Sequence, residues 1–224
     1  MISGGNMITI ALDGPAGSGK STIANLLADK LNIIHLDTGA LYRGLGYKCK
    51  KLNLDASNEE DAKNIASNTE IDVVFEGKEQ KIIVDGEDIT HKIRTPEISK
   101  MASQISKHLA IREKLIHLQR DLGKRGNIII DGRDICSVVL PNAKYKFYLD
   151  ASPEVRAKRR YDELLESGQD VNYDVILQEI KDRDFADMNR PISPLKRTDD
   201  AIYIDSSNMQ IDDVINEFLK YIKG

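Results

Sequence analysis

Residues Gly14 to Ser21 read GPAGSGKS, which fits the spacing G-x-x-x-x-G-K-[ST]. An apolar run ends just before them at Leu12, so the motif lies between a predicted strand and a predicted helix. In that setting backbone N–H groups turn inward around phosphate oxygens, and the lysine adds a cation that stabilises phosphoryl transfer. The motif therefore predicts a nucleoside triphosphate site with Lys20 in a catalytic role. The predicted contacts are Gly14, Pro15, Ala16, Gly17, Ser18, Gly19, Lys20, Ser21 and Thr22.

Oxygen groups that suit Mg²⁺ occur at two places. The Ser21 hydroxyl ends the motif and is a hard oxygen ligand of the kind that Mg²⁺ prefers. Asp131 follows the apolar run 128–130, and the end of a parallel strand is where α/β proteins place ligand groups. We expect Ser21 to bind Mg²⁺ with phosphates and water, and Asp131 to hold the ion through water while Arg133 faces phosphate. A polar loop without a ligand is the alternative, which the clustering of charges disfavours.

Arginines recur at helical spacing in a later segment. Arg156, Arg159 and Arg160 lie at i, i+3 and i+4, after the helix start predicted by Ser152-Pro153. Like charges on one helix face repel each other, which favours a mobile cover that closes on triphosphate oxygens over a solvated face. We expect Arg156 and Arg160 to be catalytic and Arg159 to bind ATP.

Two further groups of charged residues admit two interpretations each. Arg183, Asp187 and Arg190 follow at i, i+4 and i+7 on one side of a predicted helix, where salt bridges within the helix fit as well as a binding face. Thr38 lies at a strand-to-helix corner and Arg43 on the first turns of that helix. Their spacing fits a capped helix with a surface arginine as well as a second phosphate site.

An alternating framework of strands and helices must position these groups. Apolar runs bounded by turn residues lie at Ile8–Leu12, Asn127–Ile130, Tyr145–Leu149 and Ala201–Ile204. Helical patterns follow Lys20 and lie at Ala40–Lys51, Ala110–Gly123, Pro153–Glu166, Tyr173–Asn189 and Ile211–Tyr221. The alternation predicts an α/β fold with a parallel sheet.

The segment 55–94 breaks this alternation. Short runs typical of antiparallel strands lie at Ile71–Phe75, Lys81–Val84 and Glu87–Ile89, with a turn at Asp85-Gly86. We interpret residues 55–94 as an insertion into one unit formed by residues 7–54 and 95–224, with a lid at about 153–170. Residues 1–6 are expected to form a disordered extension.

The composition is that of an ordinary globular protein. Of 224 residues, 41% are hydrophobic and 30% charged, which excludes the disordered and fibrous classes. The net charge of −4 argues against a protein that coats nucleic acid, so any bound anion needs a local site. No run of about 18 apolar residues occurs, so no membrane span is expected. Cys49 and Cys136 lack CxxC or zinc-ligand spacing, which predicts free thiols in the cytoplasm.

Five segments, in order along the chain, resemble the bacterial cytidylate kinases, a family of nucleoside monophosphate (NMP) kinases. They are GPAGSGKST, DTGALYR, IRTPEISKMASQISKHLAIREKL, DGRDICSVVLPNAKYKFYLDASPEVRAKRR and RDFADMNR. The resemblance, which runs from about Met7 to the C-terminus, implies a three-layer P-loop nucleoside kinase core with a parallel sheet. It further implies a β-containing insertion that contributes to the NMP-binding domain, and a helical lid. The implied reaction transfers the γ-phosphate of ATP to CMP or dCMP with Mg²⁺, giving ADP and CDP or dCDP.

The resemblance also assigns the acceptor site by position. Thr38, Tyr42 and Arg43 correspond to the corner that binds the acceptor phosphate, with Arg133 beside it. The groups that correspond to contacts with cytosine, ribose and phosphate are Ser103, Arg112, Asp134, Arg183, Asp187 and Arg190. The chain departs from the family pattern at Thr38, where serine is usual, and at Cys136-Ser137, where Gly-Thr is usual. Both hydroxyls are retained.

Other functional classes remain as alternatives. GTPase switches and motor ATPases share the phosphate motif, but no Asn-Lys-x-Asp stretch for reading guanine is present. A kinase with another small acceptor, such as AMP or shikimate, and a nucleotide-binding regulatory module without turnover are further hypotheses. An acceptor phosphate is ionised already, so no general base is needed, and the four histidines are expected at the surface or partly packed. We expect a cytoplasmic monomer that binds ATP and CMP or dCMP, and neither nucleic acid nor a membrane.

Overall fold

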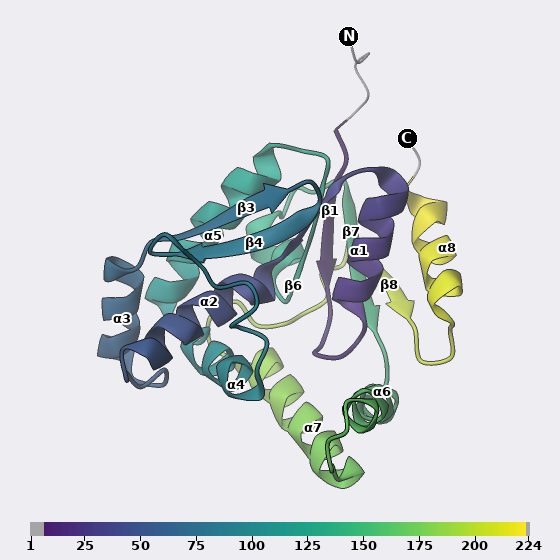
Figure 1. The fold of residues 1–224 in the computed structure, drawn as a ribbon. Helices are drawn as coiled ribbons and strands as arrows, with labels where there is room; N and C mark the ends of the chain where they lie inside the picture. The colour runs from purple at the N-terminus through teal and green to yellow at the C-terminus, as the bar shows by residue number, and fades with distance from the viewer. Residues whose placement is uncertain (1–6, 223–224) are drawn as a thin grey trace.

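The computed structural model describes residues 7–222, and the extension expected at residues 1–6 lies outside them. Within the described chain, helices flank both faces of a five-stranded parallel sheet (Figure 1). The sheet has the order β2-β6-β1-β7-β8. Its strands are β1 (Thr9–Asp13), β2 (Ile34–Asp37), β6 (Ile128–Gly132), β7 (Tyr145–Asp150) and β8 (Ile202–Asp205). The predicted parallel sheet is confirmed.

The helices follow the predicted pattern closely. They are α1 (Lys20–Leu31), α2 (Thr38–Lys51), α3 (Glu59–Asn68), α4 (Pro96–Ile105), α5 (Leu109–Lys124), α6 (Pro153–Glu166), α7 (Tyr173–Asn189), α8 (Ile211–Tyr221) and a short π-helix, η1 (Ile135–Val139). The corner predicted at Thr38 implied a strand that the apolar runs did not include, and β2 is that strand. The sequence patterns did not single out α3 and α4. The α3 helix buries only Ala62 and Ile65, which gives a weak periodic signal. Thr95 caps α4 ahead of Pro96, a start signal that the pattern analysis missed.

The central strands divide their side chains between two cores. Successive residues of a strand face opposite sides of a sheet. In β1, Ile10 and Leu12 join a cluster with residues of α1 and α8, whereas Ala11 joins a cluster with residues of α2 and α5. In β6, Ile129 lies in the first cluster, and both of its neighbours lie in the second. The sheet is therefore the middle of three layers, as the resemblance implied.

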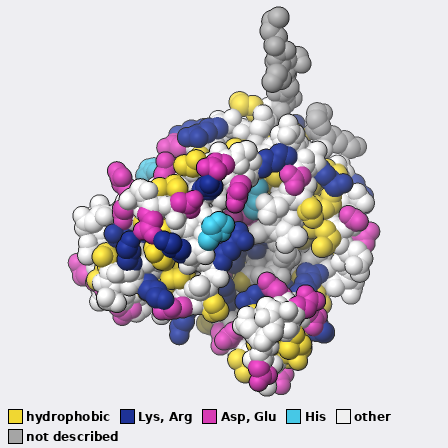
Figure 2. Space-filling model, viewed as in Figure 1, with side chains coloured by type: hydrophobic (Ala, Val, Ile, Leu, Met, Phe, Trp, Pro, Cys, Tyr) yellow, Lys and Arg dark blue, Asp and Glu magenta, His cyan; other side chains and the backbone are white. Residues whose placement is uncertain are grey.

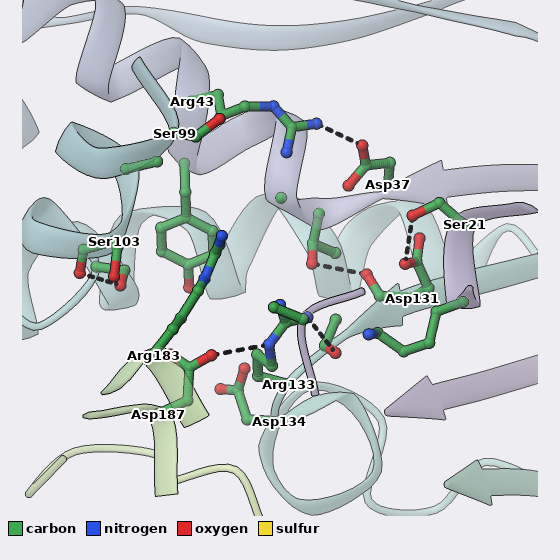
Figure 3. A pocket seen from close by; sticks show the side chains of 18 of the residues that line it. Ser21, Asp37, Arg43, Ser99, Ser103, Asp131, Arg133, Asp134, Arg183 and Asp187 are labelled. Atoms are coloured by element: carbon green, nitrogen blue, oxygen red, sulfur yellow. Dashed lines mark hydrogen bonds and ion pairs between the residues drawn. The ribbon is translucent and has the colours of Figure 1, made fainter. Parts of the chain in front are cut away.

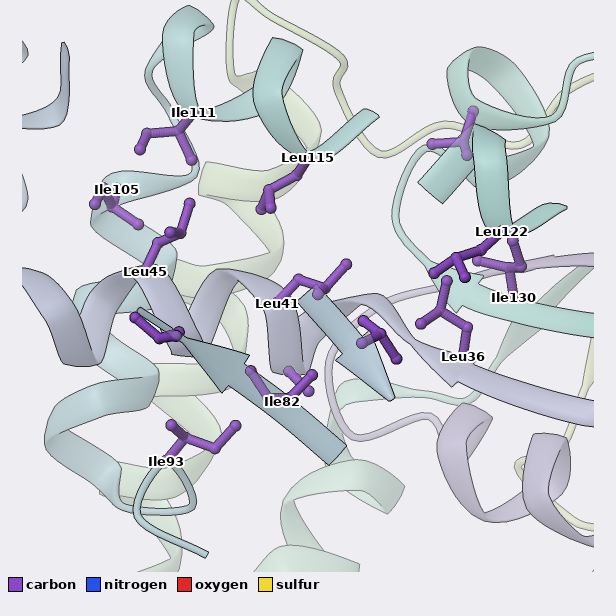
Figure 4. Close-up of a cluster of buried hydrophobic side chains, with 14 of the residues drawn as sticks. Leu36, Leu41, Leu45, Ile82, Ile93, Ile105, Ile111, Leu115, Leu122 and Ile130 are labelled. Atoms are coloured by element: carbon purple, nitrogen blue, oxygen red, sulfur yellow. The ribbon is translucent and has the colours of Figure 1, made fainter. Parts of the chain in front are cut away.

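The segment 55–94 forms α3 and a second, antiparallel sheet in the order β3-β4-β5. Its strands are β3 (Ile71–Glu76), β4 (Glu79–Val84) and β5 (Glu87–Asp88). The turn at Asp85-Gly86 is confirmed, with φ of 49° and 78°. The sheet packs on α2, since Ile82 shares one buried cluster with Leu41 and Leu45 (Figure 4). The insertion is thus continuous with the core of the molecule.

The strand order predicts a ligand site at the carboxyl ends of the central strands of the parallel sheet. From β1 the chain passes to β2 at one edge, and later strands continue to β8 at the other edge. Ligands of open α/β sheets bind at the carboxyl ends of the strands where the order reverses. The motif after β1 and Asp131 in β6 both lie at such an end. No helix within residues 7–222 has the length and apolar character needed to cross a membrane.

Phe218 provides a test of the second core. It is fully buried on α8, with its ring centroid 4.4 Å from that of Phe147. Because truncation would leave a cavity that the sheet cannot fill, Phe218→Ala should lower the free energy of unfolding by about 3–5 kcal/mol in urea titrations. The exposed control Lys220→Ala should change it by less than about 0.5 kcal/mol. Equal effects of the two substitutions would contradict the packing described.

Candidate active site

The loop between β1 and α1 folds back against the sheet. A Cβ at Gly14 would lie 2.0 Å from the carbonyl oxygen of Leu149, so this close approach requires glycine. Lys20 begins α1 and is 5% exposed. Its Nζ donates to the Pro15 carbonyl at 2.6 Å and to the Ser18 hydroxyl at 3.3 Å. Burial holds the pKa of Lys20 well below its ordinary value. The lysine is therefore held by the loop that would surround the phosphates.

Asp131 lies beside this loop and is nearly fully buried. Its Oδ2 accepts a hydrogen bond from the Ser21 hydroxyl at 3.0 Å, and its backbone oxygen accepts one from the Thr38 hydroxyl at 2.8 Å. Its Oδ1 lies 2.6 Å from Nε2 of His35. Burial would lower the pKa of His35, but the hydrogen bond and charge of Asp131 raise it. The expectation that every histidine is at the surface or partly packed is wrong for His35, because β2 lies next to β6.

The donor set at Ser21 fits a nucleotide-bound Mg²⁺. Ser21 Oγ and Asp131 Oδ2 lie side by side at the pocket (Figure 3). Both are hard oxygen ligands, the kind that Mg²⁺ prefers. Residues 7–222 contain no group of three or more His, Cys, Asp or Glu that could hold a metal ion.

One cavity of about 340 Å³ joins the loop between β1 and α1, residues 14–19 and called the phosphate loop below, to α2, α4, α5 and α7. Figure 2 shows Lys and Arg side chains at the hollow between the α6–α7 pair and the rest of the molecule. The predicted residues that line the cavity are Ala16, Gly17, Gly19, Lys20, Ser21, Thr22, Thr38, Tyr42, Arg43, Ser103, Arg112, Asp131, Arg133, Asp134, Arg183, Asp187 and Arg190. Those that do not line it are Gly14, Pro15, Ser18, Arg156, Arg159 and Arg160. The fold thus brings most of the predicted residues into one space.

The start of α2 forms one wall of the cavity. Asp37 caps the helix by accepting from the Ala40 N–H at 3.2 Å, and its other oxygen accepts from Arg43 Nη2 at 2.6 Å. Sequence reasoning identified Thr38 and Arg43 but missed Asp37, although an aspartate directly before a helix is a cap signal. Arg43 is therefore held at the cavity by the residue that begins its own helix.

The opposite wall holds a buried ion pair. Arg112 of α5 is 1% exposed and donates to Asp134 Oδ2, while Nη2 of Arg190 lies 3.8 Å from Asp134 Oδ1. The Arg112 guanidinium also lies 5.5 Å from the centre of the Tyr42 ring. Burial raises the pKa of Tyr42 to about 12, so its hydroxyl is neutral at pH 7. The pair fixes a carboxylate and a guanidinium in a site shielded from water.

Asp187 connects α7 to the loop after β6. Its Oδ2 accepts from Arg133 Nε at 3.0 Å, and its Oδ1 lies 3.8 Å from Arg190 Nη1. Burial would raise the pKa of Asp187, but the charges of Arg133, Arg183 and Arg190 hold it below its ordinary value. Asp187 thus pairs with Arg133 after β6 and with Arg190 directly after its own helix, and Arg183 lines the cavity with it.

Arg156 lies on α6 at 2% exposure. It forms a two-point ion pair with Asp184 of α7, Nη1 to Oδ1 at 3.1 Å and Nη2 to Oδ2 at 2.5 Å. It also donates from Nε to the Ala151 carbonyl at 2.8 Å and from Nη1 to the Ala16 carbonyl at 2.9 Å. The sequence analysis assigned the neighbouring Arg183 to the site but did not identify Asp184. In this conformation Arg156 joins α6 and α7 to the phosphate loop.

The other two arginines of α6 have different surroundings. Arg159 donates to the Ser206 carbonyl at 2.9 Å, in the loop between β8 and α8. Arg160 is 45% exposed and pairs with Glu163 on its own helix. The spacing placed the three arginines in one group, but neighbouring elements separate their environments.

Asp13 supports the loop that carries Arg133. It is fully buried at the end of β1, and its two oxygens accept the backbone N–H groups of Ile135 at 2.8 Å and Cys136 at 2.7 Å. Cys136 is 1% exposed in η1 and has no positive φ, so its side chain fits without backbone strain. Burial raises the pKa of Asp13 to about 6, although these two hydrogen bonds oppose the change.

Comparison with known proteins gives a consistent picture. A family model described as cytidylate kinase matches residues 10–224. The chain is 48% identical over 213 residues to a cytidylate kinase of Caldicellulosiruptor saccharolyticus, covering 95% of this chain and 94% of the relative. It is 42% identical over 216 residues to a cytidylate kinase of Bacillus subtilis, covering 96% of each. An uncharacterized protein from Eubacterium ventriosum has a similar fold, with a TM-score of 0.52, 15% identity, and coverage of 96% of this chain and 98% of that chain.

The raised pKa of Asp13 predicts how stability depends on pH. A folded-state pKa of about 6, above the ordinary 3.8, means that the folded chain binds this proton more tightly than the unfolded chain. The resulting stability is fully present below about pH 3.8 and is lost as the pH rises through about 6, by up to about 3 kcal/mol. The free energy of unfolding of the wild type, relative to Asp13→Asn, should fall across this interval in urea titrations at each pH. A difference that does not vary between pH 4 and 7 would contradict the shift.

Proposed function

The chain belongs to the cytidylate kinase family, and on that premise we propose how its residues divide the work of phosphorylating CMP with ATP. The observation that carries the proposal is the single cavity with the phosphate loop at one end and buried arginines at the other. Phosphoryl transfer proceeds through a loose transition state, so the protein has to align the two substrates and balance charge. A donor site and an acceptor site in one cavity meet that requirement.

The phosphate loop forms the donor end. Its backbone N–H groups and the N-terminus of α1 face the phosphates of ATP, and Lys20 follows the charge of the migrating group. Mg²⁺, when bound with ATP, neutralises phosphate charge. Ser21 would hold the ion directly, and Asp131, which accepts a hydrogen bond from the Ser21 hydroxyl, would hold it through water. His35 in turn keeps Asp131 in place.

The acceptor end holds the nucleoside monophosphate. We assign Thr38, Tyr42, Arg43 and Arg133 to the acceptor phosphate, whose oxygen is ionised near pH 7 and needs no general base. We assign the base, ribose and remaining phosphate contacts to Ser103, Arg112, Asp134, Arg183, Asp187 and Arg190. Cytosine has an N4 amino donor beside N3 and O2 acceptors, which complement a carboxylate and a guanidinium. The buried Arg112–Asp134 pair offers these two groups together. The same pocket would take dCMP as a second acceptor.

The α6–α7 pair forms a lid in this proposal. Arg156 and Arg160 would reach the transferring phosphates and Arg159 the ATP when residues 153–170 close, a step that excludes water. Arg156 lies nearest to this task, because it already contacts the phosphate loop through Ala16. Its pair with Asp184 would hold it there until the substrates bind.

We further propose one kinase unit, residues 7–54 and 95–224, with residues 55–94 contributing to the acceptor side. Donor and acceptor residues lie in one cavity of a single chain, which supports a monomer. Cys49 and Cys136 are free and buried, which fits a reducing compartment, and we place the enzyme in the cytoplasm.

Lys20→Met tests the donor end. Removal of a cation that stabilises the migrating phosphoryl group should reduce kcat for CMP phosphorylation on the order of a thousandfold. The measurement is a coupled assay for ADP in the presence of CMP, ATP and Mg²⁺. Lys30→Met, an exposed lysine on the same helix, is the control and should retain wild-type kcat. Near-normal turnover by a folded Lys20→Met variant would refute the assignment.

Asp134→Asn tests how the base is read. UMP has an O4 acceptor where CMP has an amino donor, so a buried carboxylate should disfavour UMP by about a hundredfold or more in kcat/KM. An amide can donate to O4, so Asp134→Asn should lower kcat/KM for CMP and narrow this ratio. The assay compares CMP with UMP for the wild type, for this variant and for the exposed control Asp182→Asn. Circular dichroism checks that each variant is folded, since Asp134 pairs with Arg112. An unchanged ratio in folded Asp134→Asn would show that Asp134 does not read the base.

A further inference from the structure

A side chain of the insertion closes the free edge of the parallel sheet. The β2 strand is the outermost strand of that sheet, so one side of its backbone lacks a neighbouring strand. At its last residue, Asp37, the backbone N–H donates to Gln80 Oε1 at 2.7 Å, and the backbone carbonyl accepts from Gln80 Nε2 at 3.1 Å. The amide of Gln80 thus matches the donor and acceptor of one residue, as a paired strand would.

Gln80 is held firmly in the place from which it makes this contact. It lies in β4, the middle strand of the antiparallel sheet, where its backbone is opposite Phe75 of β3. The same sheet packs closely on α2. A Cβ at Gly44 would lie 3.1 Å from side-chain atoms of both Ile71 and Ile82. Figure 4 shows Ile82 facing Leu41 and Leu45 of the helix. The insertion therefore fixes Gln80 relative to α2 through a shared core.

Asp37 passes this restraint on to the cavity. Its carboxylate accepts from the first turn of α2 at Ala40 and from Arg43 at 2.6 Å. The side chains of Asp37 and Arg43 are each about one quarter exposed. An ion pair in contact with water is weak, so its geometry depends on how firmly the backbone of Asp37 is held. Figure 3 shows Arg43 directed toward Asp37 above the cavity. Any rotation of the Asp37 backbone would move the carboxylate and, with it, the guanidinium.

We propose that Gln80 is a positioning residue for the acceptor phosphate, acting through Asp37 on Arg43. The proposal rests on the assignment of Arg43 to the acceptor phosphate, and it gives the insertion a specific role in the reaction. Gln80 itself touches no reacting atom. Its amide holds the backbone of Asp37 at the end of β2. The Asp37 carboxylate in turn orients Arg43, which we assign to the phosphate of CMP.

A double-mutant cycle on the full-length protein tests this chain of contacts. Gln80→Glu keeps the size and one acceptor but replaces the donor to the Asp37 carbonyl with an oxygen. We expect it to weaken CMP binding about tenfold, measured by calorimetry without ATP, and to leave KM for ATP within about twofold. Arg43→Gln should weaken CMP binding by at least about thirtyfold. In the Arg43→Gln background, Gln80→Glu should have less than about a twofold effect, because the group that it positions is gone.

The outcomes separate the two assignments. Equal effects of Gln80→Glu in both backgrounds, or no effect in the wild type, would overturn the positioning role while leaving Arg43 in place. Wild-type CMP binding by Arg43→Gln would remove the acceptor-phosphate assignment and overturn the proposal with it. Glu79→Gln, the exposed neighbour on β4, is the matched control and should bind CMP as the wild type does. If Gln80→Glu is unfolded by circular dichroism, Gln80→Met takes its place in the same cycle with the same criteria.

Discussion

Asp131 joins three separate parts of the chain at the floor of the cavity. Its carboxylate binds Ser21 at the start of α1 and His35 in β2, and its backbone oxygen binds Thr38 at the start of α2. A buried carboxylate is costly unless hydrogen bonds and opposite charge compensate it. The fold meets that cost by bringing α1, β2 and α2 to the end of β6. The same residue therefore holds together the ends of the cavity that we assign to the donor and the acceptor.

The remaining charges of the cavity follow a related constraint. Its lining contains six cations, Lys20, Arg43, Arg112, Arg133, Arg183 and Arg190, against four carboxylates, Asp37, Asp131, Asp134 and Asp187. Asp37, Asp134 and Asp187 each form an ion pair with one of these cations, whereas Asp131 pairs with His35. The lining therefore keeps an excess of positive charge for phosphate. The chain as a whole carries a net charge of −4. A local excess inside an acidic protein directs anions to this cavity and not to the general surface.

Two elements on the rim restrain the cavity in different ways. The antiparallel sheet packs on α2 through a continuous apolar core and reaches the end of β2 through Gln80. The α6–α7 pair meets the phosphate loop through the polar contacts of Arg156 with Ala16 and Asp184. Packed apolar contacts resist displacement, whereas an arginine in an ion pair can exchange its carboxylate partner for a phosphate. This difference suits the fixed acceptor wall and the movable lid that we propose.

Local patterns in the sequence determined most of the framework and much of the site. The phosphate motif depends on neighbours within eight residues, so its glycines, Lys20 and Ser21 could be recognised directly. Strand alternation and helix periodicity are also local, and they predicted the parallel sheet and most helices. The acceptor residues came from the resemblance to a known family, and the cavity that the structure describes contains all of them. The short helices α3 and α4 were missed. The α3 helix buries only Ala62 and Ile65, and the start signal of α4, Thr95 before Pro96, was not used.

Only the tertiary structure decided which distant residues face each other. His35 and Asp131 are separated by 96 positions, Gln80 and Asp37 by 43, and Arg156 and Asp184 by 28. No local periodicity encodes such pairs, because they depend on the order of strands in the sheet and on how the insertion packs. The same holds for burial. No sequence pattern indicated that Asp13 is buried. It is fully buried because β1 is the central strand of the sheet, and this burial raises its pKa to about 6.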